Sequence, residues 1–163
     1  MIILGIDPGT ASTGYGVIKK LNSDKRSKAF RCVEYGVIRT LPTSKAQDRL
    51  KKLNNELSKI IKKHQPEILI IEHLYFFKNL KTIIPVSQAS GVILLTAAKN
   101  NLPVSGITPP QVKLAITGFG RAEKKEVQEK IKIMLNMKEI PRPDDAADAL
   151  AIALAFYLKK EEA

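Results

Sequence analysis

The sequence contains no tryptophan, one cysteine and two histidines. Cys32 alone excludes an internal disulfide and any zinc site built from several cysteines. His64 and His73 stand apart in the chain, which argues against a metal site based on histidine. Disulfide and zinc chemistry therefore give no lead to function.

Long hydrophobic runs are also missing. No stretch reaches the roughly 18 consecutive apolar residues that span a membrane. The N-terminal segment Met1–Leu4 lacks the basic leader and small-residue cleavage site of a signal peptide. We expect a cytoplasmic protein that does not bind membranes. With 163 residues, 44% hydrophobic content and no linker-like segment, residues 1–163 should form one domain.

Acidic residues are scarce relative to basic ones. The chain has 27 Lys and Arg against 16 Asp and Glu, a formal charge of +11. Such an excess favours a polyanionic partner, because basic side chains that neutralise phosphates release counterions. A lysine-rich solvated surface is the alternative explanation.

The apolar pattern predicts alternating strands and helices. Residues 1–6, 14–18 and 31–39 read as three strands whose short connections require an antiparallel meander. Ser44 and Gln47 match a capping box that would open a helix before Pro66. Further strands are expected at 67–71 and 103–107, and further helices at 83–99, 111–116, 124–135 and 145–160. This order predicts a three-layer α/β fold with a mixed central sheet flanked by helices.

Carboxylates follow two of the predicted strands. Asp7 ends the first apolar run and Glu72 ends the run Ile68–Ile71. Ligands in such sheets bind outside the carboxyl ends of parallel strands. Asp7 could also be an ordinary turn residue, because Pro8-Gly9 follows it. Glu72 is harder to explain without a function, because an unpaired charge beside the core costs stability.

Three more acids begin the last predicted helix. Asp145 and Asp148 are three residues apart and share a helix face. Asp144 is four residues from Asp148, so periodicity cannot choose between Asp144 and Asp145. These acids could simply favour the helix dipole, with Asp144 as the cap. Clustered carboxylates repel unless a cation intervenes. Mg²⁺ takes oxygen ligands, and a pair of such ions can drive phosphodiester hydrolysis.

Several motifs together resemble the RuvC family of Holliday-junction resolvases. They are Gly5-Ile6-Asp7-Pro8-Gly9 with Thr13-Gly14-Tyr15-Gly16, then Ile71-Glu72, then Asp145-Ala146-Ala147-Asp148-Ala149-Leu150-Ala151. Similarity continues through Lys78-Asn79, Gln88-Ala89 with Gly91, Gln111-Val112-Lys113 and Ala122-Glu123-Lys124, and so covers essentially the whole chain.

The resemblance implies a ribonuclease-H-like fold and a homodimer. It also implies Mg²⁺- or Mn²⁺-dependent paired nicking of four-way DNA junctions during recombination and repair. The products would carry 5′-phosphate and 3′-hydroxyl ends, and the RuvA–RuvB branch-migration complex would be a partner. The catalytic, metal-binding acids would be Asp7, Glu72, Asp145 and Asp148, which selects Asp145 over Asp144.

The resemblance also suggests residues that contact DNA. Lys113 and Lys124 match lysines placed near the scissile phosphates, although each alone is one of many lysines. Lys78 falls in a matching segment. Tyr75 stands where relatives often have phenylalanine and could stack on an unpaired base. The family often has arginine where this chain has Ser90, which weakens the case for a phosphate contact there.

Other functions remain as rivals. Asp7-Pro8-Gly9-Thr10 also fits the phosphate loop of actin-like and sugar-kinase ATPases, but those enzymes need two lobes. A non-catalytic junction-binding protein would use the charge and the aromatics, but its four acids would repel phosphate. A nuclease of the same fold that acts on RNA or an RNA–DNA hybrid is separated only by the family resemblance.

Overall fold

Five strands form one mixed sheet in the order β3-β2-β1-β4-β5. The computed structural model describes residues 1–9, 11–21, 30–73 and 80–162. The strands are β1 (Ile2–Asp7), β2 (Ser12–Lys20), β3 (Phe30–Arg39), β4 (Ile68–Glu72) and β5 (Val104–Ile107).

The expected meander is confirmed. Strands β1, β2 and β3 pair antiparallel in sequence order, whereas β4 pairs parallel to both β1 and β5. Ile6 of β1 lies opposite Ile71 of β4 in the parallel register. The next residues, Asp7 and Glu72, therefore end neighbouring parallel strands at the same edge of the sheet.

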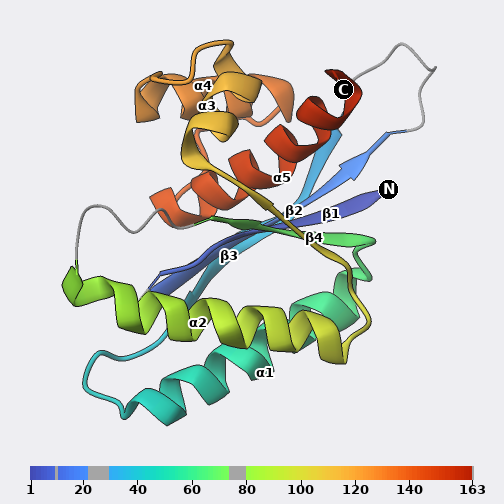
Figure 1. Cartoon of the computed structure of the whole chain (residues 1–163). Coiled ribbons are helices and arrows are strands. Elements are labelled where there is room, and N and C mark those ends of the chain that lie inside the picture. Colours follow the sequence, from blue (N-terminus) through green and yellow to red (C-terminus); the bar gives the residue numbers. More distant parts are fainter. Residues whose placement is uncertain (10, 22–29, 74–79, 163) are drawn as a thin grey trace.

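Helices cover both faces of the sheet, which confirms the three-layer prediction (Figure 1). Helices α1 (Ala46–His64) and α2 (Leu80–Lys99) lie on one face. Helices α3 (Pro109–Thr117), α4 (Lys124–Met134) and α5 (Asp144–Glu162) lie on the other. Among the described residues, none of these helices has the length and apolar content needed to cross a bilayer.

The beginning of α1 differs from the prediction. Lys45 is the N-cap and makes no side-chain capping hydrogen bond, so the capping box expected at Ser44 and Gln47 is wrong. The Ser44 amide instead donates to the carbonyl of Leu41 in a turn, and the helix begins at Ala46. The complete capping box in the described chain belongs to α3, where Thr108 and Gln111 each accept the other's backbone N–H.

The beginning of α2 also differs. This helix begins at Leu80 rather than at Ile83, and it contains Pro85. A proline lacks the amide hydrogen that the helix interior uses, so Pro85 removes one backbone hydrogen bond near the start of α2. The buried side chains of Ala89, Ile93 and Ala97 belong to the core beneath α1 and α2.

Helix α5 packs unusually close to β1 and β2. A Cβ atom added to Gly5 would collide with the carbonyl oxygen of Ala149, and one added to Gly14 would collide with that of Asp145. On the helix side, the facing residues are mostly alanines: Ala146, Ala147, Ala149 and Ala153 are each fully buried. Small residues on both sides therefore bring the backbone of α5 directly over the strands, and this carries the first turns of α5 to the end of β1.

We predict that Gly14→Ala disrupts this packing. The added methyl group would push α5 away from β2, and overpacking of this kind destabilises by roughly 1–3 kcal/mol. Gly91→Ala is the matched control, because a Cβ on Gly91 meets nothing within 4 Å. It should instead gain up to about 1 kcal/mol of helix stability. Urea unfolding of the two variants measures both effects, and equal stability of Gly14→Ala and the parent chain would contradict the packing argument.

Candidate active site

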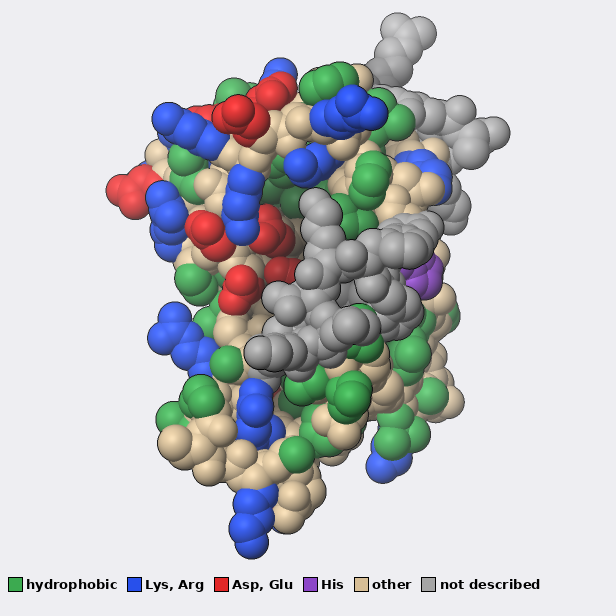
Figure 2. Space-filling model, turned by 60° about the vertical axis from the view of Figure 1, so that its left-hand side comes forward, with side chains coloured by type: hydrophobic (Ala, Val, Ile, Leu, Met, Phe, Trp, Pro, Cys, Tyr) green, Lys and Arg blue, Asp and Glu red, His purple; other side chains and the backbone are tan. Residues whose placement is uncertain are grey.

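Five charged side chains from five elements line one cavity of about 240 Å³. Asp7 and Glu72 come from the ends of β1 and β4, and Asp148 comes from the second turn of α5. Lys113 of α3 and Lys124 of α4 line the same cavity. On the face shown in Figure 2, acidic side chains gather in one area with Lys and Arg side chains around them. The cavity therefore presents carboxylates at its base together with two cations.

Burial and mutual repulsion make the two strand-end acids hard to ionise. Burial, together with the charges of Glu72, Asp148 and Asp145 and against an opposing effect of Lys124, raises the pKa of Asp7 to about 7. Burial and the charge of Asp148, against an opposing effect of Lys124, likewise raise the pKa of Glu72 to about 7. A cation placed among these carboxylates would relieve both effects.

Lys124 already supplies one positive charge to this cluster. Its Nζ donates to Oδ2 of Asp148 at 2.7 Å. Burial disfavours the ammonium, but hydrogen bonding to Asp148 and the nearby charges of Asp148 and Asp144 raise the pKa of Lys124. The pKa of Asp148 is still raised by burial, although Lys124 opposes the rise. One internal cation is therefore shared among several carboxylates.

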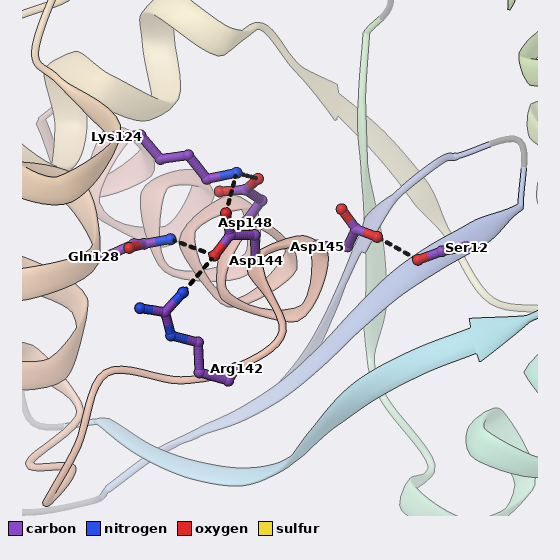
Figure 3. Close-up of polar contacts among 7 residues, drawn as sticks. All are labelled: Ser12, Lys124, Gln128, Arg142, Asp144, Asp145 and Asp148. Carbon is purple, nitrogen blue, oxygen red and sulfur yellow. Dashed lines mark hydrogen bonds and ion pairs between the residues drawn. The ribbon is translucent and has the colours of Figure 1, made fainter.

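Asp145 faces a different partner from Asp148. Its carboxylate accepts a hydrogen bond from the Ser12 hydroxyl of β2, on the side of α5 away from Lys124 (Figure 3). Asp145 nevertheless lies close enough to raise the pKa values of Asp7 and Asp148. The structure thus places Asp145 beside the cavity, with its side chain held by Ser12.

Asp144 is the first residue of α5 itself and not the cap that the sequence suggested. Its Oδ1 accepts from Gln128 Nε2 and from Arg142 Nη1, each at 3.2 Å. Its Oδ2 lies 3.5 Å from Lys124 Nζ. Asp144 and Asp148, four residues apart, therefore share Lys124, whereas Asp145 points elsewhere (Figure 3).

The donor set fits a hard divalent cation. Carboxylate oxygens are the ligands that Mg²⁺ and Mn²⁺ accept most readily. In the part of the chain that the structure describes, no three His, Cys, Asp or Glu side chains stand close enough to hold one ion as arranged. Asp148 accepts a hydrogen bond from Lys124, and Asp145 accepts one from Ser12. These two acids would have to turn from their present partners to join Asp7 and Glu72.

The predicted DNA contacts divide into two groups. Lys113 and Lys124 lie at the cavity, as expected for cations near a phosphate. Tyr75 and Lys78 lie outside the described residues, so their predicted contacts remain predictions.

Sequence reasoning missed three of the polar residues at the site. Ser12, Gln128 and Arg142 each hold an acid of α5. The spacing of Lys124 and Gln128, four residues apart in one helix, placed them on one face. Nothing in the sequence indicated that this face meets Asp144.

The fold and the acids together define a class. The crystal structure of the yeast mitochondrial Holliday junction resolvase Ydc2 matches this fold with a TM-score of 0.71 and 14% identity, over 98% of this chain and 79% of that one. At this identity the likeness shows the fold alone. The chain has the ribonuclease-H-like fold of resolvases, with acids at the ends of its central parallel strands.

The family is shown by sequence. The model of the family described as crossover junction endodeoxyribonuclease RuvC matches residues 3–156, and the chain belongs to this family. The relative from Fusobacterium nucleatum is 48% identical over 154 residues, or 94% of this chain and 78% of the relative. The one from Caldicellulosiruptor saccharolyticus is 48% identical over 158 residues, or 97% and 93%.

Solved structures agree with this assignment. Thermus thermophilus RuvC matches with a TM-score of 0.91 and 31% identity over 99% of this chain and 96% of that one. The same protein in complex with a Holliday junction substrate matches with a TM-score of 0.88 and 30% identity over 99% and 96%.

The raised pKa values of Asp7 and Glu72 predict how stability depends on pH. A carboxyl whose pKa is higher in the folded state binds more protons folded than unfolded, so metal-free stability should fall as pH rises from about 4, where unfolded carboxyls ionise, to about 7. Asp7→Asn should flatten this dependence and add on the order of 2 kcal/mol at the upper end.

Denaturant unfolding at several pH values, without metal, tests this expectation. The exposed Asp48 of α1 provides the matched control, since Asp48→Asn also removes one carboxylate. Added Mg²⁺ should stabilise the parent chain more than Asp7→Asn. A pH slope unchanged by Asp7→Asn would contradict the electrostatic account of the cavity.

Proposed function

We propose that this protein is a crossover junction endodeoxyribonuclease that resolves four-way DNA junctions by paired nicks. The observation that supports this most directly is the single cavity where Asp7, Glu72 and Asp148 face Lys113 and Lys124. The family match over residues 3–156 supplies the substrate class. The formal charge of +11 suits a phosphate backbone as partner.

The reaction is hydrolysis of a phosphodiester. The oxygen of a water molecule bonds to phosphorus while the bond from phosphorus to O3′ breaks. A proton passes to O3′, which leaves a 3′-hydroxyl on one fragment and a 5′-phosphate on the other. Negative charge builds on the phosphoryl oxygens as the bonds exchange, so cations near these oxygens lower the barrier.

The chain's own residues would divide this work. Lys113 and Lys124 supply fixed positive charge at the cavity, where they can bind and orient the scissile phosphate. Asp7, Glu72, Asp145 and Asp148 would hold Mg²⁺, with Mn²⁺ as a substitute. When bound, such an ion lowers the pKa of a water and stabilises phosphoryl oxygens. The parallel pairing of β1 and β4 places Asp7 and Glu72 side by side, where they would serve as ligands.

Paired nicks at two strands require two active sites, so a two-fold homodimer is part of this proposal. The exposed side chains of α2 support its role in the interface. Ile84, Leu94 and Leu95 are 67%, 46% and 53% exposed, although Ala89 and Ile93 of the same helix are buried. Apolar side chains grouped on one exposed helix are typical of interfaces. The RuvA–RuvB complex remains a proposed partner through the family alone.

The rivals can be weighed on the same features. A protein that only binds junctions has no use for buried acids with raised pKa values, which cost stability. The described residues form one sheet with helices on both faces, which supports a single domain over 1–163, whereas an ATPase of the actin-like kind needs two lobes. A ribonuclease of this fold would use the same cavity, so the substrate has to be tested.

We predict that the protein nicks a synthetic mobile four-way junction in two opposed strands when Mg²⁺ is present. Asp7→Asn should reduce the rate by at least about 100-fold because it removes a buried ligand from the cavity. Junction binding in Ca²⁺ should persist. Denaturing gels of end-labelled strands measure the cuts, and phosphatase and ligase treatment of the products identifies their ends.

Linear duplex and an RNA–DNA hybrid of matched sequence are the controls. Faster cutting of the hybrid than of the junction would move the function to a ribonuclease. Tight junction binding without metal-dependent cutting would indicate an architectural protein.

A further inference from the structure

Lys124 stands between two carboxylates of α5. Its Nζ lies 2.7 Å from Oδ2 of Asp148 and 3.5 Å from Oδ2 of Asp144. Asp148 lines the cavity with Asp7 and Glu72, whereas Asp144 lies one turn earlier at the start of the helix. Lys124 therefore has a nearer partner that lines the cavity and a more distant one that does not. Both contacts are drawn in Figure 3.

The side chain of Asp144 is held in place from two other directions. Gln128, which is 7% exposed, reaches Oδ1 of Asp144 from the same helix as Lys124. Arg142, just before α5, reaches the same oxygen. Lys124 and Gln128 of α4, with Arg142 from the loop before α5, thus converge on the Asp144 carboxylate, which is about half exposed. An exposed acid whose sole role was to interact favourably with the helix dipole would need no such side-chain partners.

The pair of Lys124 with Asp148 conflicts with the proposed chemistry. If Asp148 takes part in holding a divalent ion, that ion competes with the Lys124 ammonium for the negative charge of one carboxylate, whose Oδ2 already accepts from Lys124, and so weakens this hydrogen bond. Charge repulsion from the ion would then drive a long flexible lysine into solvent. The nearest carboxylate that remains available is Asp144, less than one ångström further away.

We propose that Asp144 is a positioning residue for Lys124. It keeps the ammonium at the edge of the cavity when Asp148 is engaged by metal, so that the cation still faces the scissile phosphate. Gln128 and Arg142 in turn fix Asp144. This inference rests on the proposed nuclease function, since it assigns Lys124 to the phosphate and Asp148 to the metal.

A double-mutant cycle on single-turnover cleavage at saturating Mg²⁺ tests this role. Asp144→Asn should slow cleavage by roughly two- to fivefold, the range expected for a partly exposed ion pair, with unchanged junction affinity in Ca²⁺. In a Lys124→Gln background the same change should have almost no effect. Asp144→Glu, which keeps the charge, should restore at least half of the parent rate.

The matched control removes a charge from the neighbouring helix. Glu126 is exposed in the first turn of α4, so Glu126→Gln lowers the negative charge near Lys124 without touching Asp144. It should leave the cleavage rate unchanged. If Asp144→Asn slows cleavage equally with and without Lys124, or if it has no effect in the parent chain, the positioning role is wrong.

Calorimetric titration of the DNA-free protein with Mg²⁺ gives a readout independent of cleavage. Lys124→Gln should tighten Mg²⁺ binding, because Lys124 competes for Asp148. Asp144→Asn should weaken Mg²⁺ binding in the parent chain, where Lys124 then has Asp148 as its remaining partner, and much less in Lys124→Gln. A protein that shows this coupling but cuts no junction would refute the proposed function alone; equal weakening in both backgrounds would refute the positioning role alone.

Discussion

The close contact of α5 with β1 and β2 is the constraint on which the site depends. Gly5 and Gly14 have no side chains where the helix backbone passes, and the alanines of α5 complete the contact. Because the first turns of the helix are pressed against the sheet, Asp145 and Asp148 reach the strand end that carries Asp7. A looser helix would leave the same acids in the sequence without bringing their charges together.

That arrangement costs stability in the absence of metal. The pKa values of Asp7 and Glu72 rise to about 7 through burial and repulsion, so near neutral pH each carboxyl is poised between its two protonation states. Lys124 relieves part of the repulsion by pairing with Asp148. Perturbed carboxyls of this kind gather at functional sites, where a bound cation offsets the repulsion. In the proposed function, Lys124 is the internal counterion that a divalent ion would displace.

The sequence predicted the parts of this site that follow from strand order. The short connections required a meander, and parallel pairing then put Asp7 and Glu72 at one edge. Helical spacing left Asp144 and Asp145 undecided, because the direction of each side chain depends on its partners. Ser12 of β2 donates to Asp145, whereas Gln128 of α4 and Arg142 just before α5 donate to Asp144. The capping-box pattern was the weakest guide, since Ser44, which it marked as the start of a helix, lies in a turn instead.

The central claim is that this cluster of acids holds a divalent metal. Anomalous diffraction from crystals grown with Mn²⁺ tests it most directly, because manganese can be located independently of the protein. If the cluster holds the metal, we expect an anomalous peak within coordination distance of Asp7, Glu72 and Asp148. The Lys124 side chain should then have moved from Asp148 towards Asp144. Metal binding by this cluster would be contradicted if, at saturating Mn²⁺, no peak appeared beside Asp7 and Glu72 and Lys124 remained bonded to Asp148.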